Sequence, residues 1–178
     1  MQTLLLMRHA KSDWEDATVP DHERPLAERG RGAAPAMAQW MRSQELRPDL
    51  VLCSTAKRTR ETWDLLEGEL CSSAEVLFLE ELYLASPRDM LGLIREHGGT
   101  AETVLMIGHN PGTHELACAL AASGPDKLLR RMDQKYPTGA LAHYRIDTLD
   151  WRTLGQRGSA LVDFIRPKDL KDPRRAGS

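Results

Sequence analysis

Polar residues of a few chemically useful types follow four short apolar runs of this 178-residue chain. Arg8 and His9 follow the first run, and residues 54–58 (STAKR) follow the second. Residues 80–81 (EE) come after the third run, and residues 108–112 (GHNPG) follow the fourth. Two imidazoles, several cationic side chains and a carboxylate therefore occur at four equivalent places in the chain.

Such a set of groups suits a phosphoryl group. Guanidinium groups bind phosphate oxygens bidentately, helix N-termini supply amide donors, and a neutral imidazole is a nucleophile toward phosphorus. A metal site fits less well, because His109 and His114 are five residues apart and miss the i,i+4 spacing that places two ligands on one helix face. No P-loop or GxGxxG motif occurs. The set predicts a phosphate site that needs no metal or other cofactor.

Each of these residues also has a plainer interpretation when it is taken alone. A single histidine after a strand is most often a surface or hydrogen-bonded residue, and Arg58 alone could be a solvated helix residue or the partner of a carboxylate. The sequence GHNPG could be a strand-to-helix turn in which Asn110 caps the helix. Their joint occurrence after successive strands favours the functional interpretation.

The elements that would position these residues follow from the apolar patterning. Four apolar runs without polar alternation are typical of strands buried on both faces; they span residues 3–7, 50–53, 76–79 and 103–107. Helical spacing of apolar residues predicts four helices, at 27–43, 58–70, 87–97 and 112–122. This alternation predicts one α/β domain of three layers, with a mostly parallel central sheet flanked by helices. Ligands bind at the carboxyl ends of the strands in such sheets, so all four sets of polar residues are expected at one edge.

The C-terminal part of the chain has a different pattern. Residues 124–139 (GPDKLLRRMDQKYPTG) are predicted to form a loop. Two alternating runs follow, at 140–146 and 160–165, and they predict a closing pair of strands at the sheet edge. The polar and basic end of the chain predicts a flexible tail at 168–178, which leaves residues 1–167 for the domain.

Composition and charge narrow the function classes. The 24 Lys and Arg nearly balance the 26 Asp and Glu, so nothing favours a nucleic-acid partner. The run from Leu4 to Met7 is far too short for a signal peptide or a membrane span, which predicts a cytoplasmic protein with no membrane partner. Cys53, Cys71 and Cys118 lack CxxC spacing, so neither a disulfide framework nor a zinc site is predicted.

Five motifs, taken in order, resemble those of the histidine phosphatase superfamily, the fold family that includes phosphoglycerate mutases. They are LMRHAKSDW, ERPLAERG, CSTAKRTRET, GHNPG and YPTGAL. Within that superfamily the chain is similar to the small bacterial phosphohistidine phosphatases of the SixA type, from residue 3 to about residue 170. The resemblance implies a phosphoglycerate mutase-like fold. It also implies that His9 is the nucleophile that becomes phosphorylated, while Arg8, Arg58 and His109 bind the phosphoryl oxygens.

One expected part of the family's machinery is less clear in this chain. Many members carry a carboxylate that protonates the leaving oxygen, and SixA-like proteins often lack an obvious one. Glu81, in the sequence LEELYLAS, is the nearest match by position and is predicted to be this acid; Glu80 is a weaker match. Both carboxylates could equally be solvated charges.

Three further residues are predicted to bind substrate. Ser12 and Arg24 lie between the first strand and the first helix, in a segment expected to fold over the same edge, and Asn110 belongs to the GHNPG motif. Ser12 could instead start a turn, and Arg24 could hold the loop through a carboxylate such as Asp21.

Together these residues predict a metal-independent phosphatase that works through a phosphohistidine intermediate. The favoured substrate is phosphohistidine on a protein such as a phosphotransfer domain, because the chain has only short insertions with which to enclose a small metabolite. Two alternatives stay open: a phosphatase of a small phosphate ester or sugar phosphate, and a phosphate-binding module without catalysis.

Overall fold

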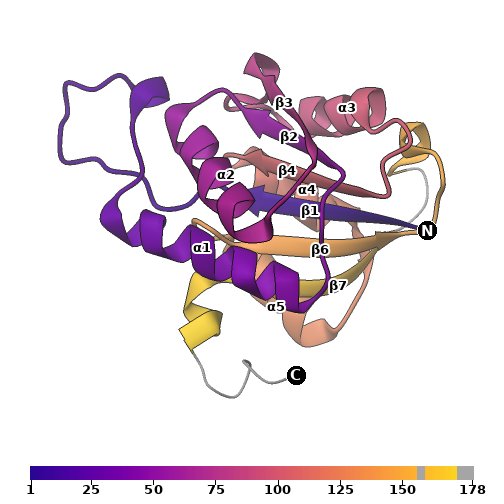
Figure 1. Ribbon diagram of the computed structural model, residues 1–178. Coiled ribbons are helices and arrows are strands. Elements are labelled where there is room, and N and C mark those ends of the chain that lie inside the picture. The colour runs from indigo at the N-terminus through magenta and orange to yellow at the C-terminus, as the bar shows by residue number, and fades with distance from the viewer. Residues whose placement is uncertain (156–158, 172–178) are drawn as a thin grey trace.

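The computed structural model describes residues 1–155 and 159–171, and these form a central sheet with helices on both sides (Figure 1). The strands are β1 (Gln2–Arg8), β2 (Leu50–Ser54), β3 (Glu75–Leu79), β4 (Thr103–Gly108), β5 (Ala121–Ser123), β6 (Leu141–Ile146) and β7 (Ser159–Ile165). The α-helices are α1 (Glu28–Ser43), α2 (Lys57–Leu70), α3 (Pro87–His97), α4 (Gly112–Leu120) and α5 (Asp126–Gln134). Four short 3-10 helices are η1 (Asp21–Glu23), η2 (Glu80–Leu82), η3 (Trp151–Thr153) and η4 (Pro167–Lys171).

The seven strands lie in the order β3-β2-β4-β1-β6-β7-β5. Strands β3, β2, β4 and β1 are parallel to one another, and β6 is antiparallel to both of its neighbours, β1 and β7. The carboxyl ends of β1, β2 and β4 therefore meet at one edge of the sheet, with β4 in the middle.

Strand β1 shows why its sequence has no polar alternation. Successive side chains of a strand point to opposite faces. Leu4 and Leu6 belong to one hydrophobic cluster of the protein, whereas Leu5 and Met7 belong to another, and all four are fully buried. Both faces of the strand are therefore covered by helices, and an apolar residue is required at every position.

The two clusters separate the helices into two layers. Met37 and Met41 of α1 and Leu66 of α2 pack in the cluster that contains Leu5. Helices α3, α4 and α5 contribute to the other cluster, which contains Leu4. The architecture is a single three-layer α/β domain of the predicted class, and the strand and helix bounds predicted before residue 112 hold within one residue.

Three element predictions for the C-terminal part of the chain are wrong, and the first two concern the strands at the sheet edge. The helix expected to reach residue 122 ends at Leu120, because Ala121–Ser123 form β5, which pairs parallel with the start of β7. The β6 and β7 pair is confirmed, but it does not close the sheet: β5 lies outside β7, and β6 lies inside the sheet next to β1. Alanine and serine carry little strand propensity, so only the pairing with a distant strand reveals β5.

The segment predicted as a loop at 124–139 contains a helix, α5. Its apolar residues Leu128, Leu129 and Met132 have helical spacing and pack on the cluster that contains Leu4. The flanking Gly, Pro and basic residues concealed this short amphipathic pattern in the sequence.

The described part of the predicted tail, residues 168–171, lies in η4. The Asp169 carboxylate accepts hydrogen bonds from the guanidinium groups of Arg166 and Arg131. Residues 172–178 lie outside the described part, and the domain boundary stays a prediction. In the part of the chain that the structure describes, no helix has both the length and the apolar composition needed to cross a membrane.

Candidate active site

The carboxyl ends of three neighbouring strands bring the two predicted site histidines together. β1, β4 and β2 end at Arg8, Gly108 and Ser54, and the next residue in the first two cases is a histidine. The His9 amide donates to the Gly108 carbonyl at 3.1 Å, which joins the two loops directly after the strands. The imidazole rings of His9 and His109 lie with their centroids 5.3 Å apart.

The His9 side chain has a fixed tautomer and a fixed charge. Its Nδ1 lies 2.7 Å from the Ala10 carbonyl oxygen, which can only accept, so Nδ1 carries the proton and Nε2 has the free lone pair. Only 6% of His9 is exposed. This burial, together with the nearby Arg58 and Arg8 guanidiniums, lowers the pKa of His9 to about 3. The imidazole is therefore neutral near pH 7, which is the state that a nucleophile needs.

His109 faces the same space from β4. Its Nε2 is hydrogen bonded to the Ser54 hydroxyl at 2.7 Å, and its buried Nδ1 has no hydrogen-bond partner among the described residues. Burial, and then the neighbouring His9 and Arg58, lower the pKa of His109 to about 3. A phosphoryl dianion bound beside the ring would raise that pKa, because an opposite charge favours the imidazolium form. His109 can thus become a charged hydrogen-bond donor when an anion arrives.

Arg8 is oriented by the segment before β6. Its Nη1 donates to the Tyr136 carbonyl at 3.1 Å, and the Asn110 side-chain amide donates to the same oxygen at 2.9 Å. The Tyr136 hydroxyl donates to the Leu6 carbonyl and accepts from the Ala142 amide, so this residue is itself fixed between β1 and β6. One buried carbonyl therefore aligns a cation and an amide at the site.

Arg58, in the first turn of α2, is held by the loop that precedes α1. Its Nη1 donates to the Asp21 carbonyl at 2.7 Å and its Nη2 donates to the Asp21 carboxylate at 3.1 Å. The Tyr83 hydroxyl donates to the same carboxylate oxygen, Oδ2. The Tyr83 ring also stands edge-on to His109, with centroids 5.5 Å apart. A guanidinium has five N–H donors, so this clamp leaves three for a ligand.

The clamp also sets the charge of Asp21. The hydrogen bond from Tyr83 and the Arg58 guanidinium hold the pKa of this carboxyl below its usual range. Asp21 is therefore an ionised carboxylate at neutral pH, and it partly balances the charges of Arg8 and Arg58. What remains is a cationic site with two neutral imidazoles, which is complementary to a phosphoryl dianion. Among the described residues, no group of three His, Cys, Asp or Glu side chains is arranged to hold a metal ion.

Comparisons with known proteins agree with this geometry. The model of the histidine phosphatase superfamily (branch 1) matches residues 4–83. An uncharacterised protein of Mycobacterium tuberculosis is 37% identical over 164 residues, which are 91% of this chain and 100% of that protein. A solved structure assigned as the phosphohistidine phosphatase SixA of Nakamurella multipartitia is 32% identical, with a TM-score of 0.79 over 93% of this chain and 96% of that one. This chain belongs to the histidine phosphatase superfamily.

The sequence resemblance is thereby confirmed, and the protein is a SixA-like phosphatase of this superfamily. A structure from Escherichia coli assigned as an alpha-ribazole-5'-P phosphatase is 17% identical, with a TM-score of 0.62 over 94% of this chain and 98% of that one. At that identity the likeness extends to the fold alone.

Two of the predicted substrate-binding residues make their contacts within the loop before α1. The Ser12 hydroxyl accepts from the Trp14 indole at 2.9 Å. Arg24 donates to the Asp16 carbonyl at 3.1 Å, stacks on Trp14 at 4.2 Å and faces the Asp21 carboxylate at 3.9 Å. No hydrogen bond joins either side chain to His9 or His109 in the described residues, and a substrate-binding role for Ser12 and Arg24 stays a prediction.

Glu81, the predicted acid, lies in η2 with an exposed side chain. Within residues 1–155 and 159–171 its carboxylate has no hydrogen-bond or ion-pair partner. The residue of this segment that contacts the histidine phosphatase site is Tyr83, two positions later, through His109 and Asp21. The carboxylate that the structure joins to the site is therefore Asp21, and the acid role of Glu81 stays a prediction.

Sequence reasoning did not assign a site position to Tyr83 or Tyr136, and it placed Asp21 in the loop expected to fold over the site edge, as a candidate partner of Arg24 and not of Arg58. Tyr136 had a signal, because it opens the YPTGAL motif. Asp21 and Tyr83 had none, since their contacts with Arg58 and with each other span 37 and 62 residues.

We expect Asp21→Ala to lower kcat/KM by about 10- to 100-fold, because a misplaced Arg58 no longer meets the phosphoryl oxygens in register. The inhibition constant of vanadate should rise in parallel, while the urea midpoint of unfolding changes little. Asp13→Ala, in the same loop, is the matched control. Because Tyr83 acts through Asp21, the double variant Asp21→Ala/Tyr83→Phe should have nearly the same kcat/KM as Asp21→Ala alone. If the losses of the two single variants added in full in the double variant, the clamp would be contradicted.

The buried neutral histidines also predict an acid-sensitive fold. The folded-state pKa of His9 and of His109 lies near 3, below the ordinary value of 6.5, so the unfolded chain binds more protons between these limits. Their contribution to stability is therefore present above pH 6.5 and is lost as the pH falls toward 3. His109→Gln should reduce the loss of unfolding free energy between pH 7 and pH 5 in urea titrations, whereas His97→Gln on α3 should not; identical pH slopes for all three proteins would contradict the prediction.

Proposed function

We propose that this histidine phosphatase removes the phosphoryl group from phosphohistidine on a protein, through a phosphorylated His9 and without a metal ion. The observation that carries the proposal is the neutral His9 imidazole, which keeps its Nε2 unprotonated and lies close to the His109 ring and to the Arg8 and Arg58 guanidiniums. The two guanidiniums supply the charge stabilisation that metal ions provide in other phosphatases.

In the first step the Nε2 lone pair of His9 attacks phosphorus and forms the new P–N bond. The bond between phosphorus and the substrate imidazole breaks, and its electron pair returns to the departing nitrogen. When the other nitrogen of that imidazole is protonated, the leaving group departs as a neutral ring and needs no proton from the enzyme. The Nδ1 proton of His9, held by the Ala10 carbonyl, stays in place throughout.

In the second step water attacks phosphorus, the P–O bond forms and the P–Nε2 bond breaks. His9 returns as a neutral imidazole, and both protons of the water leave with the phosphate product. Arg8 and Arg58 keep the phosphoryl oxygens in position in both steps, because their guanidiniums are fixed by Tyr136 and Asp21.

The carboxylates of the site favour a nitrogen leaving group. An alkoxide leaving group needs a proton donor, and efficient enzymes supply one from a positioned acid. Asp21, the carboxylate bonded to Arg58, is held ionised, and the Glu81 side chain is exposed. Phosphohistidine needs no such donor, which supports it over an alkyl phosphate.

Exposed apolar side chains near the site support a protein substrate. Trp14 lies in the loop after β1 and is 58% exposed, and Leu84 follows η2 and is 57% exposed. Phe78, near the end of β3, is 46% exposed. All three side chains lie on segments at or near the carboxyl ends of the parallel strands β1 and β3, the edge of the sheet that carries the site, where a protein substrate would contact them. The name of the 32% identical SixA structure points to the same substrate class.

We expect His9→Ala to abolish phosphoenzyme formation, because no other group at the site has a free nucleophilic lone pair aimed by a fixed tautomer. Brief incubation with a ³²P-labelled phosphoprotein should give an acid-labile, base-stable label in the parent protein only. His97→Ala, on α3, is the control and should be labelled like the parent. Equal labelling of His9→Ala would remove the proposed nucleophile.

We expect Glu81→Gln to change kcat/KM by less than about threefold for both a phosphohistidine protein and an aryl phosphate, because neither leaving group needs a general acid. The parent protein should prefer the phosphohistidine protein to a primary alkyl phosphate. If Glu81→Gln instead slows alkyl phosphate hydrolysis by roughly 10²–10⁴-fold, the size typical of general acid catalysis, Glu81 is the acid and the small-ester alternative is favoured.

A further inference from the structure

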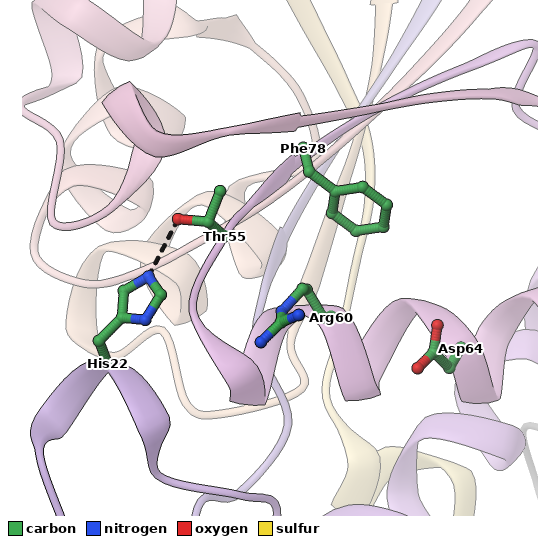
Figure 2. Close-up of a pocket in the computed structure, with 5 residues that line it drawn as sticks. All are labelled: His22, Thr55, Arg60, Asp64 and Phe78. Atoms are coloured by element: carbon green, nitrogen blue, oxygen red, sulfur yellow. Dashed lines mark hydrogen bonds between the residues drawn. The ribbon is translucent and has the colours of Figure 1, made fainter.

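A groove of about 500 Å³ opens beside the phosphoryl site, between α2 and β3. Figure 2 shows its five lining residues: His22 and Thr55 lie together at one end, Arg60 lies on the near turn of α2, and Asp64 and Phe78 lie farther along. Its volume is in the range of pockets that enclose a small ligand or a few side chains.

The end of the groove formed by His22 and Thr55 is continuous with the catalytic loops. The His22 Nε2 and the Thr55 hydroxyl are hydrogen bonded at 3.0 Å and close this end. Thr55 directly follows Ser54, which binds His109, and His22 directly follows Asp21, which binds Arg58. The two loops that form the phosphoryl site therefore also form one end of the groove.

A row of aromatic rings connects the nucleophile to the groove. Ring centroids are 5.3 Å apart from His9 to His109, 5.5 Å from His109 to Tyr83, and 4.9 Å from Tyr83 to His22. His22 is the last ring of this row and the first residue of the groove. The row therefore places the near end of the groove three ring contacts away from His9.

The groove offers binding groups that the fold does not use. The side chains of Arg60 and Asp64, one turn apart on α2, have no hydrogen-bond or ion-pair partner among the described residues. Phe78 is 46% exposed on β3, which is the edge strand of the sheet and leaves that side of the groove open. The hydrogen bond from His22, and then the Arg60 and Lys57 cations, lower the pKa of the Glu23 carboxyl, so both cations lie near the end of the groove that adjoins the site.

We propose that this groove binds the polypeptide next to the phosphohistidine of the substrate protein, with an apolar side chain against Phe78 and an acidic side chain against Arg60. The inference rests on the proposed function. It identifies the surface on which the substrate protein docks and the side chains that select this protein. A phosphohistidine held at His9 necessarily places its own neighbours over the adjoining surface, and this groove adjoins it. The open side at β3 admits a folded partner, and the Arg60 guanidinium, which has no side-chain partner among the described residues, favours an acidic group over a basic one.

The experiment compares three substrates: a phosphotransfer domain phosphorylated with phosphoramidate, free phosphohistidine and p-nitrophenyl phosphate. The variants are Phe78→Ala and Arg60→Glu, with Arg60→Lys as the conservative variant. Arg88→Glu, exposed on α3, and Leu149→Ala, exposed far from the groove, are the matched controls.

We expect Phe78→Ala and Arg60→Glu to lower kcat/KM for the phosphorylated domain about tenfold, mainly through KM, the size typical of losing one central contact of an interface. For both small substrates, kcat/KM of these variants should stay within about twofold of the parent value. Arg60→Lys should keep most of the parent's kcat/KM for the phosphorylated domain. The controls should match the parent on all three substrates.

Other outcomes overturn the inference in distinguishable ways. Unchanged hydrolysis of the phosphorylated domain by both groove variants would show that the partner docks elsewhere, with the proposed function intact. Equal losses on all three substrates would show that the groove residues support the catalytic loops only. A parent protein that hydrolyses only small esters would overturn the proposed function itself, and the docking inference with it.

Discussion

The site depends on burying β1 on both faces while ending it next to His9, the proposed nucleophile. Leu4 to Met7 pack alternately into the two hydrophobic clusters, so the strand has no freedom to shift along its axis. His9 follows directly and shares this burial. Desolvation disfavours its charged form, and the Ala10 carbonyl selects the tautomer, so the packing that fixes its position also prepares its chemistry.

A rigid nucleophile needs equally rigid cations, and two distant segments provide them. The Tyr136 carbonyl holds Arg8, and the Asp21 backbone and carboxylate hold Arg58. Arginine suits both places because its planar fork can bind a protein carbonyl with one part and phosphoryl oxygens with another. Asp21 limits the repulsion between the two guanidiniums without blocking either imidazole, since its own carboxylate is occupied by Arg58 and Tyr83.

The sequence alone determined the fold class and the first four strands, and together with the family resemblance it led to four proposed central site residues. Runs buried on both faces are local patterns, and the rule that parallel strands end at one edge converts their order into proximity. Arg8, His9 and His109 could therefore be placed together without coordinates, because each lies at or directly after a strand end. Arg58 could be added because it lies in the segment after β2 whose motif resembles that of the family. The two elements that the sequence did not predict, β5 and α5, have weak local signals. The residues of β5 have a low strand propensity, and α5 is short and bordered by turn residues.

Only the tertiary structure decided which carboxylate joins the site and which groove lies beside the site. Asp21 meets Arg58 and Tyr83 across 37 and 62 residues, and no local pattern encodes such a meeting. The groove likewise exists only where η1, α2 and β3 come together, with Phe78 facing Arg60 from another element (Figure 2). Strand and helix periodicity reports which face of an element is buried, whereas the loop contacts that complete a site depend on the packing of elements that are remote in the chain. For that reason the sequence could locate the proposed nucleophile and the proposed phosphate-binding groups, and only the folded chain revealed the Asp21 clamp that holds Arg58.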